Sequence, residues 1–133
     1  MATTIFPALR EELQTITHRK PDIIYIDQNR NCTIVEVTVC YDLYMSFAYE
    51  AKVRIYTPLI TLLRQRGYNT KLVVLCFGSL GTVEKSVFKS LMCFNNDKNV
   101  VKSTIKWCSV SVIIMANYIW RYRLRFINEQ LLG

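Results

Sequence analysis

The sequence predicts an α/β fold in which a small mixed β-sheet is flanked by helices. Two observations carry this prediction. Runs rich in β-branched residues at 22–27 and 32–40 stand on either side of a short polar segment, and the longer segments around them repeat apolar residues at helical spacing. The 133 residues are 51% hydrophobic and 20% charged, which is typical of a folded protein, so we expect residues 1–133 to form a single domain.

The first half of the chain predicts a helix, a hairpin and a second helix. Residues 5–17 show helical spacing, and Pro21 marks a break after them. The two β-branched runs then predict an antiparallel hairpin whose turn is formed by residues 28–31. Residues 44–66 return to helical spacing, and we expect Pro58 to kink or divide this helix.

The second half predicts one further strand and two helices. Residues 71–77 are almost wholly apolar, as expected for a strand covered on both faces. A turn at 78–81 leads into a helix at about 82–93, and a long final helix is expected over about 98–131. Its apolar stretch, residues 107–120, is too short to span a membrane, so we interpret it as a buried helix. A hairpin followed by a helical crossover predicts a mixed sheet, in the order α-β-β-α-β-α-α.

The charge of the chain points to an anionic partner. With 17 Lys and Arg against 10 Asp and Glu, the net charge is +7 and the pI about 9.3, which favours nucleic acid, with acidic membrane surfaces as the other candidate. The five cysteines have no metal-ligand spacing and do not suggest a disulfide framework, so we expect a reducing, intracellular location. Cys40 and Cys76 are expected to be buried thiols. The first residues lack a basic segment followed by an apolar stretch, so we expect no signal peptide.

Glu36 is the unusual residue of the predicted hairpin. It interrupts a run that otherwise suits a buried strand, and a lone buried carboxylate costs several kcal/mol unless it is paired or bound to a metal. The hairpin should bring Asp22 close to Glu36, and Thr38 should share the face of Glu36. Two neighbouring carboxylates repel each other, and a divalent cation such as Mg²⁺ would resolve that repulsion.

These motifs resemble a known family. Arg19-Lys20-Pro21-Asp22, a hairpin and then Val35-Glu36-Val37-Thr38 are similar to the restriction-like endonuclease domain of site-specific non-LTR retrotransposons, within the PD-(D/E)XK nuclease superfamily. Most of the superfamily has a lysine two residues after the acid, where this chain has Thr38; the retrotransposon family moves it to the next helix, where Lys52 fits. The resemblance covers roughly residues 5–78 and implies a restriction-endonuclease-like α-β-β-α-β core with two further C-terminal helices.

The resemblance also implies an activity. It is that of a divalent-metal-dependent endonuclease that hydrolyses DNA phosphodiester bonds in the nucleus, where a nick would prime retrotransposon integration. Asp22 and Glu36 would hold Mg²⁺ (or Mn²⁺), and Lys52 would orient the attacking water and stabilise charge at the phosphate. We add three candidate site residues, Glu12, Thr38 and Tyr56. The family further implies that the chain is part of a larger reverse transcriptase polyprotein.

Basic residues predict where nucleic acid would bind, although a solvated helix face explains each basic stripe about equally well. The predicted contacts are Arg19, Lys20, Lys98, Lys102, Lys106, Arg121 and Arg125. A second interpretation of the whole chain is a catalytically inactive nuclease-fold module for nucleic-acid binding or dimerisation. The displaced lysine supports it, and the apolar stretch at 107–120 leaves a homodimer open.

Overall fold

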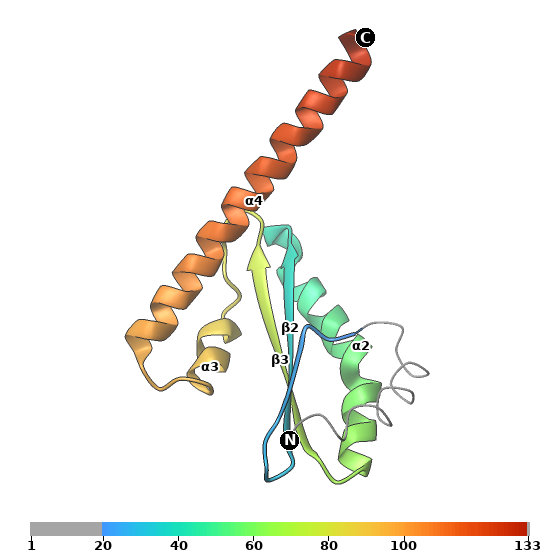
Figure 1. Ribbon diagram of the computed structural model, residues 1–133, viewed down its shortest axis with the longest axis vertical. Coiled ribbons are helices and arrows are strands. Elements are labelled where there is room, and N and C mark those ends of the chain that lie inside the picture. Colours follow the sequence, from blue (N-terminus) through green and yellow to red (C-terminus); the bar gives the residue numbers. More distant parts are fainter. Residues whose placement is uncertain (1–19, 133) are drawn as a thin grey trace. The chain divides into compact units, whose positions relative to one another are not determined.

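The computed structural model describes residues 20–132 and shows a mixed α/β fold with a three-stranded mixed sheet (Figure 1). The elements are β1 (Ile23–Ile26), β2 (Asn31–Cys40), the short 3₁₀ helix η1 (Asp42–Tyr44), α2 (Met45–Gln65), β3 (Asn69–Gly78), α3 (Ser86–Met92) and α4 (Lys98–Leu132). The strand order is β1-β2-β3, with β1 antiparallel to β2 and the arrows of β2 and β3 pointing the same way in Figure 1. The helix predicted over residues 5–17 lies outside the described residues, as do Glu12 and Arg19.

The chain divides into two compact units that alternate along the sequence. Of the described residues, unit 1 holds 20–38 and 46–75, and unit 2 holds 39–45 and 76–132. Unit 1 therefore contains β1, nearly all of α2 and most of β2 and β3, whereas unit 2 contains α3 and α4. The prediction of a single domain stays a prediction.

The β1–β2 hairpin is held at its turn by one carboxylate. Asp27 Oδ1 accepts hydrogen bonds from the backbone N–H groups of Asn29 and Asn31 at 2.8 and 2.9 Å, and its Oδ2 accepts one from Asn31 Nδ2 at 2.7 Å. Arg30 takes the left-handed conformation (φ 61°) that closes the turn. The ladder runs from Ile26 opposite Cys32 to Ile23 opposite Val35, so the predicted hairpin and its turn are confirmed.

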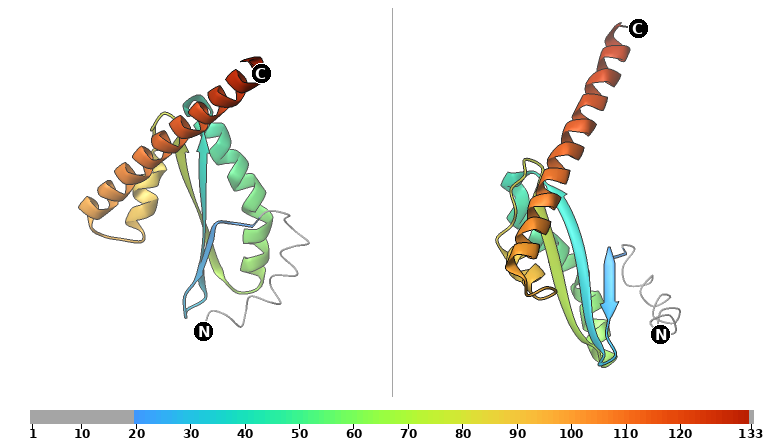
Figure 2. Two further views of the ribbon diagram at one scale, coloured as in Figure 1. Left: turned by 45° about the horizontal axis from the view of Figure 1, so that its top comes forward. Right: turned by 60° about the vertical axis from the view of Figure 1, so that its left-hand side comes forward.

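Helix α2 packs against the sheet of unit 1 through its apolar face (Figure 2). Tyr56, Leu59 and Leu63 meet Cys32 and Ile34 in a core of fully or almost fully buried side chains. Burial of Leu59, Leu63 and Ile34 contributes roughly 1.5–3 kcal/mol for each side chain. The helix continues through Pro58 without the division that we expected as one outcome, because the packed face on both sides of the proline holds its turns in place.

The segment before α3 departs from the sequence prediction. We expected a helix from about residue 82, but α3 begins at Ser86, because residues 82–84 fold back onto β3. Val83 forms a bridge with Phe77, and Glu84 N donates to the Cys76 carbonyl at 3.1 Å. Backbone pairing with a strand thus outweighs local helix propensity in this segment.

Helix α4 is confirmed in extent, but the predicted burial of its apolar stretch is wrong. The first turns pack against α3 through the buried Val101, and Ser109 Oγ donates to the Gly81 carbonyl at 2.6 Å. Trp107 and Trp120, the two ends of the apolar stretch, are 75% and 61% exposed. The short α3 accounts for this, since its seven residues cover only the start of a 35-residue helix. No helix among residues 20–132 has the length and apolar character needed to cross a membrane.

The five cysteines are free thiols. Cys76 is buried, as predicted, whereas Cys40 is only partly buried, and their sulfur atoms lie 3.9 Å apart. Burial raises the pKa of the Cys76 thiol to about 12, and the hydrogen bond with Cys40 acts in the same direction. This thiol therefore stays protonated near neutral pH.

Candidate nuclease and metal site

Glu36 is placed by strand alternation on the face of β2 that meets α2. Cys32, Ile34 and Glu36 follow one another at a spacing of two, and the first two belong to the core under α2. Glu36 is consequently buried, with 4% of its surface exposed. Its carboxylate ends the apolar row and lies where the core gives way to polar groups.

Lys52 supplies the positive charge beside that carboxylate. Its Nζ lies 2.5 Å from Glu36 Oε1, so the ammonium group and the carboxylate form an ion pair and a charge-assisted hydrogen bond. The Glu36 side chain is 5% exposed and that of Lys52 23%, so the ammonium group stands at the boundary with solvent. One N–H bond of the ammonium is used here, and no second protein acceptor for it is found among residues 20–132.

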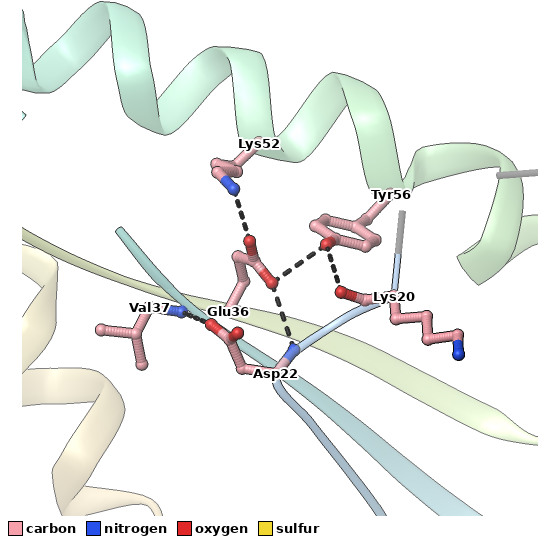
Figure 3. Close-up of polar contacts among 6 residues, drawn as sticks. All are labelled: Lys20, Asp22, Glu36, Val37, Lys52 and Tyr56. Atoms are coloured by element: carbon pink, nitrogen blue, oxygen red, sulfur yellow. Dashed lines mark hydrogen bonds and ion pairs between the residues drawn. The ribbon is translucent and has the colours of Figure 1, made fainter. Parts of the chain in front are cut away.

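Tyr56 lies one helical turn after Lys52 and reaches the other oxygen of the same carboxylate (Figure 3). Its hydroxyl is 3.0 Å from Glu36 Oε2 and 3.3 Å from the carbonyl of Lys20. A phenol has one proton to donate, so these two acceptors share it. The ring is 1% exposed, and Tyr56 thus joins α2, β2 and the segment before β1 at one buried point.

Asp22 is brought to Glu36 by the register of the hairpin. Extending the ladder by one pair beyond Ile23 and Val35 sets Asp22 opposite Glu36. The backbone N–H of Asp22 is 3.3 Å from Glu36 Oε2, and Asp22 Oδ2 accepts a 2.7 Å hydrogen bond from the backbone of Val37. Asp22 is exposed, and within the described part of the chain its Oδ1 has no hydrogen-bond donor.

Some of the predicted site residues lie together around Glu36, and the others lie elsewhere in the structure. Asp22, Glu36, Lys52 and Tyr56 form one connected network, drawn in Figure 3. Lys20 contributes its carbonyl, while its amine points away from Glu36 in the same view. The other predicted residues take no part in this network: Thr38 lies further along β2, and Lys98, Lys102, Lys106, Arg121 and Arg125 are exposed on α4.

The contacts of Glu36 correct one expectation from the sequence, namely that this buried carboxylate requires a cation. We reasoned that the buried Glu36 needed a cation because Asp22 would add repulsion, but Lys52 and Tyr56 already compensate the carboxylate. The sequence does hold a signal for this arrangement. Lys52 and Tyr56 are four residues apart on a predicted helix and therefore lie on one face of it, directed at the same point.

A divalent cation at this site would have two candidate carboxylate ligands, Asp22 and Glu36. Among residues 20–132 no group of three or more His, Cys, Asp and Glu side chains forms a metal cluster. Mg²⁺ requires less than this, because it commonly binds through one or two carboxylates and keeps several waters. Asp22 offers an exposed carboxylate oxygen without a donor among residues 20–132, and its backbone N–H contacts the carboxylate of Glu36.

Comparison with protein-family models, curated proteins and solved structures gives no match for this chain.

Proposed function

We propose that the chain is a divalent-metal-dependent endonuclease that hydrolyses DNA phosphodiester bonds, in the manner implied by its resemblance to the retrotransposon endonuclease domains. The observation that carries the proposal is that Asp22, in the residue before β1, and Lys52, on α2, both contact the carboxylate of Glu36 on β2. Two acids can hold a metal ion that activates water and neutralises the phosphate, and a lysine can stabilise the charge that develops there. They are separated by 14 and 16 residues, so their meeting is a property of the fold.

Each of these residues has a distinct task in the proposal. Asp22, with its exposed oxygen, and Glu36 would hold Mg²⁺ or Mn²⁺. When bound, the cation would supply charge neutralisation at the scissile phosphate and lower the pKa of a water ligand. Lys52 has ammonium protons directed at no other protein group in the described chain, and they can orient a water or stabilise a phosphate oxygen.

Tyr56 keeps Glu36 in the orientation that this arrangement needs. Its hydroxyl fixes Oε2 from the buried side, which leaves the carboxylate little freedom to turn. In the proposal Tyr56 is a positioning residue that acts through Glu36. The restriction-endonuclease-like topology and the retrotransposon setting belong to the same proposal.

A non-catalytic nuclease-fold module is the second candidate function, and one observation favours it. Both oxygens of Glu36 are already engaged, Oε1 by Lys52 and Oε2 by Tyr56 and the backbone of Asp22. A carboxylate satisfied in this way can serve as a structural anchor with no cation. In that case the +7 chain would bind nucleic acid without cutting it.

A nicking assay separates the two candidates. Supercoiled plasmid would be incubated with the full chain and Mg²⁺ or Mn²⁺, using wild type, Asp22→Asn, Glu36→Gln and Lys52→Met. We expect metal-dependent nicking that falls by at least about 100-fold in each variant, as is usual when an electrostatic group of an active site is removed. Nicking by the wild type that persists in all three variants would overturn the site assignment.

Controls distinguish loss of chemistry from loss of fold. Glu50→Gln and Arg54→Gln remove charges from exposed positions of α2, so we expect both to nick at the wild-type rate. Each variant would also be unfolded in urea. Plasmid binding without nicking by a folded wild type would support the non-catalytic module and refute the nuclease proposal.

A further inference from the structure

Most of the surplus positive charge of the chain is concentrated on α4. This helix carries six lysines or arginines and a single acid, Glu129, so it holds five of the seven net charges. The basic residues are Lys98, Lys102, Lys106, Arg121, Arg123 and Arg125. None of them forms an ion pair within the described part of the chain, where the Lys52–Glu36 pair is the one salt bridge found. The charge of α4 is therefore available to a partner.

The last turns of α4 are also uncovered on all sides. Every residue from 117 to 131 is exposed, including aromatic and branched side chains such as Trp120 and Tyr122. Within unit 2, α3 lies beside the beginning of α4 and not beside these turns (Figures 1 and 2). Exposed apolar side chains in this number normally mark a surface that binds a partner.

The three arginines of this segment project from opposite sides of the helix. Successive residues of an α-helix are about 100° apart around the axis. Arg121 and Arg125 therefore lie about 40° apart, while Arg123 lies about 160° from each of them. The residues at 120, 124, 127 and 131, all apolar and exposed, form a strip between these two sides.

We propose that the segment 117–131 of α4 inserts into the major groove of duplex DNA, which deepens the proposed function and rests on it for the choice of nucleic acid. The groove is about 12 Å wide and accepts an α-helix, with a phosphate backbone along each wall. Arg121 and Arg125 would contact one wall and Arg123 the other. The apolar strip faces the base edges, where thymine methyl groups offer apolar contact.

The same features disfavour two other partners. A second copy of α4 would bring together two helices of net charge +5, with arginines beside the apolar strip of each and one acid to offset them. An anionic membrane surface suits a helix with one apolar and one polar face. Here the side opposite the strip carries Glu129 together with Tyr122 and Phe126, so the segment does not divide into one apolar and one polar face. Charge complementarity and two-sided arginines together favour the groove.

The test measures DNA binding without cleavage. A labelled duplex of about 20 base pairs would be titrated with the full chain in EDTA, by fluorescence anisotropy, at salt concentrations between about 50 and 200 mM. Each neutralised phosphate contributes about 0.9 to the slope of log affinity against log salt. We expect Arg121→Gln and Arg123→Gln each to lower the magnitude of the slope by about 0.9. The loss of affinity between about 50 and 200 mM salt should then be roughly 3.5-fold smaller in each variant than in the wild type. The matched control, Arg54→Gln on α2, should leave the slope unchanged.

Several outcomes would overturn the groove proposal. One is a slope that changes with Arg121→Gln and not with Arg123→Gln, since that indicates contact on one side. A second is binding to duplex RNA that is as tight as binding to DNA, because the A-form major groove is too narrow for a helix. A third is binding to phosphatidylserine vesicles in place of DNA. A fourth is concentration-dependent self-association in ultracentrifugation that the arginine variants strengthen. Because EDTA prevents cleavage, a failed nicking assay with intact arginine effects refutes the nuclease alone.

Discussion

The ion pair between Lys52 and Glu36 provides the sharpest test of how the candidate site is stabilised. Replacing Lys52 by Met keeps much of the side-chain length and removes the charge. Glu36, 5% exposed, then keeps its carboxylate with hydrogen bonds from Tyr56 and the backbone of Asp22 but without a counter-charge. The variant should lower the free energy of unfolding.

The expected size lies between two known limits. Removing one partner of a fully buried pair costs about 3–5 kcal/mol, and exposed pairs contribute at most about 1 kcal/mol. Lys52 is 23% exposed, and the carboxylate keeps its other donors, so we expect a loss of about 2 kcal/mol, or roughly 30-fold in the unfolding equilibrium. Urea denaturation at neutral pH would measure it.

A double-mutant cycle assigns the loss to the pair itself. Lys52→Met and Glu36→Gln together should destabilise by less than the sum of the two single changes, because the double variant leaves no unpaired charge. Arg54→Met, at an exposed position of the same helix, should change the free energy of unfolding by less than about 0.5 kcal/mol. Additive effects at Lys52 and Glu36 would refute the role given to the ion pair.

Two further predictions concern groups whose pKa is shifted. Hydrogen bonds from the side chain and backbone of Asn31 hold the pKa of Asp27 below its usual 3.8, so Asp27 stabilises the fold above that pH and the contribution is lost as pH falls through the lowered value. Urea midpoints measured from pH 5 to pH 2 should show this loss in wild type and a smaller one in Asp27→Asn; equal pH dependence would contradict it. Cys76, with its pKa of about 12, should react with iodoacetamide at pH 8 roughly 1,000-fold more slowly than a thiol with the ordinary pKa of 9.0. The exposed Cys93 should react first, and mass spectrometry of the labelled chain would show the order of labelling. Early labelling of Cys76 would be inconsistent with its burial.

The strands and the hairpin could be predicted because local chemistry determines them. The β-branched runs and the polar turn gave β1, β2 and their pairing, and that pairing in turn predicted the approach of Asp22 to Glu36. Lys52 was located by resemblance to a family and its contact with Glu36 is observed. Such features depend on residues within one hairpin and the next helix.

Other features depend on contacts that a single sequence does not specify. The predicted start of α3 was wrong because residues 82–84 fold back and pair with the end of β3, which helical spacing alone does not reveal. The predicted burial of residues 107–120 was wrong. The apolar composition of a helix indicates that another surface can pack on it, but not which part of the chain supplies that surface. The compensation of Glu36 by Lys52 and Tyr56 was missed because it depends on the side-chain contacts between β2 and α2.

The tight turn at Asp27 has a consequence for how this chain can vary. Because side chains alternate between the faces of a strand, a slip of β1 by one residue would carry Asp22 to the opposite side of the sheet, away from its acidic neighbour and the ammonium group. The three hydrogen bonds accepted by Asp27 fix the loop length that prevents this slip. An inserted residue must therefore bulge outward at the tip of the loop or separate the two acids.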